Sequence, residues 1–258
     1  MPEQAWFVVL QYAGAGFAGW QRQPDARTVQ GEVERALGRL ADEPVTVHAA
    51  GRTDTGVHAL AQVASFTLRR PWPPADLHRA LNALLPDDIW AAETGPAEPG
   101  FHARKHATSR RYRYTIGCDP AARSPFRRPW EWPLGRPLDA AALRDVAARI
   151  AGEHDFRAFA AAGPARPHYR CRVVEAVWHE RPAAEGFIFT IEADRFLHRM
   201  VRFLVGVSVD VALGRRPADD VTRLLGEQDN RHASPPAPPE GLSLIGVRYP
   251  HFARGFDA

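Results

Sequence analysis

The sequence predicts an α+β fold made of two similar α/β halves with mainly antiparallel sheets. Segments typical of strands and of helices follow one another without the strict strand–helix–strand alternation of a parallel sheet. Two strand-like stretches, CRVVEAVWHE and GFIFTIEADR, are separated only by residues 181–185, which predicts an antiparallel hairpin. The chain has 258 residues, 45% hydrophobic and 24% charged, enough for one large domain or two smaller ones.

The first half of the chain is expected to hold three strands and two helices. AWFVVLQY predicts a strand that the following glycines end. Thr28 is a favoured N-cap residue, and the apolar residues after it recur at helical spacing. The second helix is expected to end near Pro86. The expected strands cover 5–12, 45–52 and 62–70, and the expected helices cover 29–40 and 74–85.

The second half is expected to begin between residues 95 and 110, and we place the boundary so that the halves are 1–103 and 104–258. The Pro-rich stretch SPPAPPEGL is expected to be a loop, because the strand-like LSLIGVRYP follows it. The expected strands cover 110–117, the hairpin at 171–195 and 242–250, and the expected helices cover 138–152 and 196–213.

Membrane and metal-binding classes of protein find little support in the composition. No run of eighteen apolar residues occurs, and the N-terminus MPEQAWFVVLQY does not resemble a signal peptide, so we expect no membrane segment. Cys118 and Cys171 lie far apart, which favours a reducing cytoplasm over a disulfide scaffold. His102 and His106 would share a helix face, but no third ligand stands near them, so no metal site is predicted.

The basic residues point to a nucleic acid partner. Lys105 is the only lysine among 33 basic residues, a bias that a GC-rich genome would also explain. Arginines cluster with aromatic residues, as in RRYRY at 110–114, and guanidinium groups suit phosphates while aromatic rings suit unstacked bases. A basic cluster is often only a solvated surface, so this pattern alone favours RNA without establishing it.

A glycine pattern, Gly14-x-Gly16-x-x-Gly19, follows the first strand at the spacing of a dinucleotide-binding turn. That mechanism requires a helix to begin at the last glycine, so that its N-terminus holds the pyrophosphate. Here WQRQPD follows, which indicates an extended segment. A turn is therefore the favoured interpretation, and a nicotinamide-dependent enzyme is the weaker alternative.

The stretch GRTDTGVHAL contains Asp54-Thr55-Gly56, the signature of aspartic proteases. Those enzymes need two such carboxylates sharing one proton, and no second Asp-Thr-Gly or Asp-Ser-Gly occurs in the chain. Arg52, two residues before Asp54, would also favour the ionised carboxylate. The protease interpretation therefore fails, and Asp54 is left on a glycine-flanked turn between two strands.

Arg202 is a second unusual residue, because it stands between Val201 and Phe203 in the largely apolar helix FLHRMVRFLVGVSVDV. A buried guanidinium is unfavourable unless an ionised partner meets it, and Asp54 would be such a partner. Alternatively, Arg202 lies on an exposed face with Arg195 and Arg199. Composition and spacing do not decide between these two arrangements.

Taken together, the motifs resemble those of the tRNA pseudouridine synthase A family. GRTDTGVHALAQVASF is similar to the catalytic motif of that family, although Thr55 stands where alanine is more common. The other motifs occur in order from Tyr12 to Pro250, and their combination is far more specific than any one of them. These are YAGAGFAGWQRQP, TVQGEVERAL, LNALLPDDI, FHARKHATSRRYRYTI, GEHDFRAF, FLHRMVRFLVG and APPEGLSLIGVRYP.

The resemblance implies an activity, a fold and roles for four residues. Such enzymes convert uridines of the tRNA anticodon stem-loop, at tRNA positions 38, 39 and 40, to pseudouridine without metal or cofactor. The implied architecture is the pseudouridine synthase fold, with two halves flanking a basic active-site cleft in a cytoplasmic homodimer. Asp54 matches the invariant aspartate, which acts as nucleophile or stabilises the sugar intermediate. Tyr112 matches the tyrosine that stacks on the target base, Arg52 the base-flipping arginine and Arg202 the basic partner of the aspartate. An RNA-binding protein without chemistry is the rival interpretation.

Overall fold

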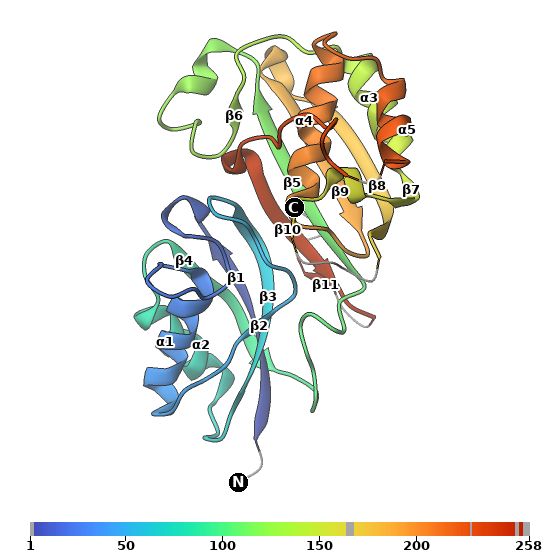
Figure 1. Cartoon of the computed structure of the whole chain (residues 1–258). Coiled ribbons are helices and arrows are strands. Elements are labelled where there is room, and N and C mark those ends of the chain that lie inside the picture. Colours follow the sequence, from blue (N-terminus) through green and yellow to red (C-terminus); the bar gives the residue numbers. More distant parts are fainter. Residues whose placement is uncertain (1–2, 164–167, 228, 251–252, 255–258) are drawn as a thin grey trace. The chain divides into compact units, whose positions relative to one another are not determined.

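The computed structural model describes residues 3–163, 168–227, 229–250 and 253–254 (Figure 1). The chain divides into two compact units: unit 1 is Met1–Arg110 with Leu244–Ala258, and unit 2 is Arg111–Ser243. Both units combine helices with mostly antiparallel strands, so the predicted α+β class is confirmed. The division into residues 1–103 and 104–258 stays a prediction, and packing assigns the segment from Leu244 onward to unit 1.

Unit 1 is a sheet with strand order β4-β1-β3-β10. The central strand β1 runs antiparallel to both β3 and β4, and its side chains are buried along most of its length. Thr28 caps α1 as predicted, because its side chain accepts a hydrogen bond from the Gly31 backbone. The elements are β1 (Gln4–Tyr12), α1 (Val29–Ala41), β2 (His48–Ala49), β3 (His58–Leu68), α2 (Pro74–Leu84), β4 (Ile89–Pro96), β10 (Leu242–Arg248) and β11 (Ala253–Arg254).

Unit 2 is a sheet with strand order β5-β9-β8-β7, and helices α3, α4 and α5 belong to it (Figure 1). The predicted hairpin is confirmed, with β8 and β9 antiparallel across residues 181–185. The buried residues of α3 face α4 and β8, which is where this unit has its core. The elements are β5 (Ser109–Gly117), β6 (Trp132–Pro133), α3 (Ala140–Ile150), β7 (Gly152–Asp155), β8 (Arg170–Glu180), β9 (Gly186–Ala193), α4 (Met200–Ala212) and α5 (Asp219–Leu225).

Short 3-10 turns lie in the connections, at Gly14–Gly16, Pro120–Arg123, Arg157–Phe159, Pro182–Ala184 and Pro239–Gly241. Several predicted boundaries were wrong. The helix predicted from residue 196 begins at Met200, because Arg199 adopts a left-handed conformation with φ of 62°. The strand predicted over 45–52 reduces to β2, because only His48 and Ala49 pair with β3. Residues 101–108 form turns and irregular backbone, so His102 and His106 do not share a helix face.

No helix within the described ranges is long and apolar enough to cross a membrane.

Candidate functional site

Asp54 lies on the loop that connects β2 to β3. Its side chain is half-buried, while Thr53 before it is buried and Arg52 is exposed. The Asp54 carbonyl accepts a hydrogen bond from the Val57 backbone at 3.1 Å, which closes a turn. Gly56 has φ of 80°, a conformation that glycine adopts without strain. Asp54 therefore begins a tight turn, and the exposed Arg52 precedes it by two residues in the same loop.

The glycine-rich segment after β1 supports this loop. The Trp20 backbone donates to the Thr53 carbonyl at 3.0 Å, and the Gly14 backbone donates to His58 Nδ1 at 3.0 Å. A Cβ atom on Gly14 would lie 2.1 Å from the Val57 carbonyl oxygen, so only glycine fits there. No helix begins at Gly19, since α1 starts at Val29. The pattern that resembled a cofactor site is a close backbone contact beneath the Asp54 loop.

Two buried polar side chains, Tyr12 on β1 and Gln62 on β3, hold the loop. The Tyr12 hydroxyl lies 2.8 Å from Thr53 Oγ1. Gln62 donates through Nε2 to the Gly51 carbonyl at 2.6 Å and to the Tyr12 hydroxyl at 3.4 Å. Burial raises the pKa of Tyr12 to about 12, so its hydroxyl stays neutral at physiological pH. These contacts fix the backbone on the N-terminal side of Asp54.

Sequence reasoning missed Tyr12 and Gln62 as supporting residues. A signal existed for Gln62, because an uncharged polar side chain stands inside the otherwise apolar strand β3, where it is fully buried. A buried amide is found almost only where it is hydrogen-bonded, so its position predicts a polar partner.

Tyr112 lies in unit 2, on β5. The strand alternates, with Tyr112, Tyr114 and Ile116 buried and the residues between them, Arg113 and Thr115, partly exposed. Only 6% of Tyr112 is exposed, and its ring meets Phe196 edge-on with the centroids 5.0 Å apart. Arg111 pairs with Glu175 at 2.8 Å. The Tyr112 ring is therefore held in a fixed orientation by the strand and by Phe196.

Arg202 lies on α4 and is half-buried, whereas Arg195 and Arg199 are exposed. Its Nε atom donates to the Ala237 carbonyl at 2.6 Å, and the Ala237 backbone donates in return to the Arg202 carbonyl at 2.9 Å. The predicted Pro-rich loop thus packs along α4. Gly206 permits this, because a Cβ atom there would lie 2.2 Å from the Pro235 carbonyl oxygen. Arg202 does not share an exposed face with Arg195 and Arg199.

The four predicted site residues fall into two groups. Arg52 and Asp54 share one loop of unit 1, while Tyr112 and Arg202 belong to unit 2. The pairing of Asp54 with Arg202 joins residues of different units and stays a prediction.

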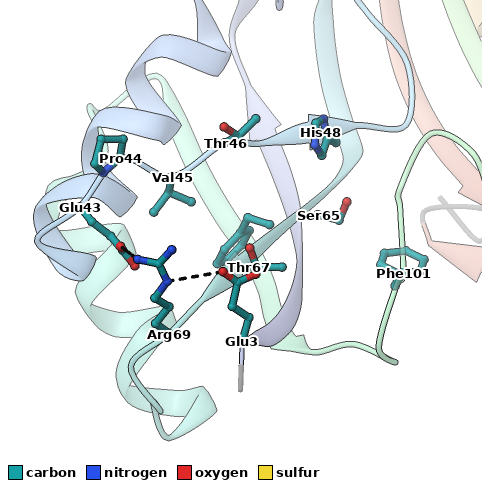
Figure 2. A pocket seen from close by; sticks show the side chains of 11 residues that line it. Glu3, Glu43, Pro44, Val45, Thr46, His48, Ser65, Thr67, Arg69 and Phe101 are labelled. Atoms are coloured by element: carbon teal, nitrogen blue, oxygen red, sulfur yellow. Dashed lines mark hydrogen bonds and ion pairs between the residues drawn. The ribbon is translucent and has the colours of Figure 1, made fainter. Parts of the chain in front are cut away.

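A separate hollow of about 240 Å³ in unit 1 contains none of these residues (Figure 2). Figure 2 shows Arg69 directed toward Glu43 and Glu3, from which it lies 2.6 and 3.5 Å away. His48 lines the hollow and stacks on the His102 ring at 4.6 Å. Burial, followed by the nearby charge of His48, lowers the pKa of His102. Within the described part of the chain, no group of three His, Cys, Asp or Glu residues could hold a metal.

Comparison with known proteins identifies the family. The sequence model described as tRNA pseudouridine synthase matches residues 8–104 and 146–250, a span that includes Arg52, Asp54 and Arg202. This chain belongs to the tRNA pseudouridine synthase family.

Several named relatives are similar to this protein along nearly the whole chain. A protein of Solidesulfovibrio magneticus named tRNA pseudouridine synthase A is 43% identical to this chain, over 94% of this chain and 90% of the relative. The relative from Moorella thermoacetica is 42% identical, over 94% of this chain and 98% of its own length. The relative from Myxococcus xanthus is 39% identical, over 94% of this chain and 91% of its own length.

Proposed function

We propose that this protein isomerises uridine to pseudouridine in the anticodon stem-loop of tRNA, at tRNA positions 38, 39 and 40. Membership of the tRNA pseudouridine synthase family over most of the chain supports the activity. The observation that carries the site assignment is Asp54 itself, a half-buried carboxylate on a loop fixed by buried hydrogen bonds from two strands. A single carboxylate held in this way suits nucleophilic or electrostatic catalysis.

The reaction exchanges one glycosidic bond for another. The N1–C1′ bond of uridine breaks, the uracil turns, and a C5–C1′ bond forms. C5 then loses its proton and N1 gains one, so the atoms balance without an oxidant or reductant. Asp54 either attacks the sugar or stabilises its developing positive charge, and both roles require the ionised carboxylate. Arg202 favours that ionised form as its cationic partner.

The target nucleotide leaves the stem before it reacts, because a stacked glycosidic bond is out of reach. Arg52 is exposed, and no ion pair or hydrogen bond engages it among the described residues. It is therefore available to fill the space that the extruded nucleotide vacates. The Tyr112 ring, which β5 and Phe196 hold in a fixed orientation, is the proposed stacking partner of the flipped base, and such stacking is worth about 1–3 kcal/mol.

The proposal extends to the surroundings of the site. Two similar halves flank a basic cleft, the protein acts as a cytoplasmic homodimer, and no metal or organic cofactor takes part. The mixed helical and antiparallel architecture supports the fold, and the family supports tRNA as the partner.

Replacing Asp54 by asparagine or alanine tests the activity. We expect pseudouridine formation on an unmodified tRNA transcript to be abolished, because asparagine cannot act as a nucleophile, while tRNA affinity is largely kept. Release of tritium from 5-tritiated uridine measures the reaction directly. Asp25→Asn, at an exposed loop position of the same unit, is the matched control and should retain full activity. Activity in Asp54→Ala would contradict the assignment.

The rival function, RNA binding without chemistry, is separated by the same assay. It predicts salt-sensitive tRNA binding by the unaltered protein with no tritium release. Mapping pseudouridines in the product also tests the assigned positions.

A further inference from the structure

Two large aromatic side chains are exposed in the segment that directly precedes β6, the strand labelled in Figure 1. Phe126 is 88% exposed and Trp130 is 53% exposed, four residues apart in the sequence SPFRRPWEW. Phe126 has by far the highest exposure among the large hydrophobic residues that the structure describes as exposed. A single exposed aromatic residue needs no explanation, but two in one short segment suggest a contact surface.

A network of charged side chains fixes this segment. Arg127 binds Asp119 through both Nη atoms, at 2.9 and 2.8 Å, and its Nε lies 2.8 Å from the buried carboxylate of Glu131. Arg181 on the hairpin donates to the same carboxylate at 2.6 Å. Fork-shaped contacts between arginine and carboxylate are both strong and specific in geometry. Phe126 and Trp130 are thus presented by a supported segment.

Two other arginines of this segment differ from Arg127 in having no acidic partner within the described residues. Arg123 and Arg128 are exposed, and in the described part of the chain neither makes an ion pair or a hydrogen bond. Both line a hollow of about 360 Å³, whose other walls are Trp132, Pro133, Pro238 and Glu240. The Glu240 carboxylate there could accept hydrogen bonds from the amino group of a base. The segment 123–130 thus carries two guanidinium groups without an acidic partner within the described residues, together with two exposed aromatic rings.

We propose that residues 123–130 form an RNA contact surface that binds tRNA apart from the reacting nucleotide. Arg123 and Arg128 bind phosphates, and Phe126 and Trp130 stack on unpaired bases. The proposal rests on tRNA being the substrate. Each nucleotide supplies both a phosphate, which suits the guanidinium groups of Arg123 and Arg128, and a π face, which suits an exposed aromatic ring. A second copy of this chain would cover the rings, but it would need free carboxylates opposite the arginines.

Alanine substitution of each ring tests the stacking. Phe126→Ala and Trp130→Ala should each raise the Kd and KM for unmodified tRNA about fivefold or more, with kcat at saturating tRNA unchanged. Phe126→Tyr should keep wild-type binding, because it retains the π face. Trp90→Ala removes a ring that is 51% exposed on β4 and is the matched control, with no change expected.

Glutamine substitution of the arginines tests the phosphate contacts. Arg123→Gln and Arg128→Gln should each reduce the slope of log Kd against log salt concentration by about one. Arg144→Gln removes an exposed arginine of α3 in the same unit and should leave the slope unchanged.

Two results would overturn the proposal. One is tRNA binding by the four variants that equals wild type. The other is a change in sedimentation of RNA-free Phe126→Ala at unchanged tRNA affinity, which would make the surface a contact between copies of the chain. Failure of the proposed function is distinguishable, since a wild-type protein that binds tRNA through these residues but forms no pseudouridine would refute the activity alone.

Discussion

At the scale of single residues, Gly14 is as necessary to the Asp54 loop as any polar contact. Its backbone donates to His58, and the carbonyl of Val57 occupies the space where a side chain would begin. Protein interiors are packed as densely as organic crystals, so an added methyl group must displace this backbone. The position of Asp54 therefore depends on a residue forty places earlier that has no side chain.

Gly14→Ala should reduce both stability and activity. Overpacking of this kind costs about 1–3 kcal/mol of unfolding free energy, measured by chemical denaturation. Because the displaced backbone carries Asp54, we expect pseudouridine formation to fall roughly a hundredfold, with tRNA affinity less affected. Gly38→Ala in α1 is the control. A Cβ atom at position 38 would lie 3.4 Å from the Glu43 carbonyl oxygen, which is an ordinary contact. Alanine also has a higher helix propensity than glycine, so α1 should keep or gain stability. Wild-type activity in Gly14→Ala would contradict this account.

Residue patterns in the sequence predicted Arg52 and Asp54 on one turn, because glycine flanks the stretch and strand-like runs surround it. They did not predict its support. Tyr12 and Thr53 are 41 residues apart, and a hydrogen bond over that separation depends on the register of β1 against β3. Local patterns give the type of an element but not its pairing partner.

At the scale of elements, the charged network around Glu131 holds the connection between β5 and β6. Asp119 accepts from the Ala121 backbone and binds Arg127, and hydrogen bonding to Arg127 lowers the pKa of Asp119 below its ordinary value of 3.8. A carboxyl group whose pKa is depressed in the native state contributes its full stabilisation when the pH is above its pKa in the unfolded state. That contribution is lost as the pH falls through the native pKa.

Asp119→Asn should therefore lower the thermal midpoint of unfolding at neutral pH, and the difference from wild type should disappear at acid pH. The midpoints of both proteins, measured between pH 7 and 3, give the test. The asparagine side chain would keep an acceptor for the Ala121 backbone, so only the charge is removed. Asp42→Asn, an exposed position that makes no ion pair within the described ranges, should show no such pH-dependent difference. A difference that grows below pH 4 would contradict the prediction.

The predicted bounds of β1, α2 and β5 agree with the structure to within one residue. Thr28 begins α1 as predicted, since the cap is a short-range contact. The start of α4 could not be predicted, because Arg199 takes a left-handed conformation that its residue type does not favour. Strands β4 and β7 and helix α5 were not predicted. In the case of β7, the strand lies at the edge of its sheet and pairs through four residues that show little hydrophobic pattern.

At the scale of the whole molecule, the proposed site draws on both units. Asp54 comes from unit 1 and Arg202 from unit 2, so the pairing depends on how the complete chain folds. Arg202→Met should shift the acid limb of the pH–rate profile to higher pH, because the ionised Asp54 loses a cationic partner. Arg199→Met, three residues away and exposed, is the matched control. An acid limb that stays in place would count against the pairing, provided that chemistry limits the rate.

Unit 1 is synthesised in two parts, because its two chain segments flank the continuous segment of unit 2. The ribosome releases the Asp54 loop early, yet β10, which lies beside β3 in the sheet, is translated only after the whole of unit 2. Four side chains of that late segment of unit 1 are buried, namely Leu244, Ile245, Val247 and Tyr249. Domains generally fold as units during translation. A nascent chain thus completes the surroundings of β3, the strand that follows the Asp54 loop, last, and a ribosome that stalls within unit 2 leaves unit 1 without β10.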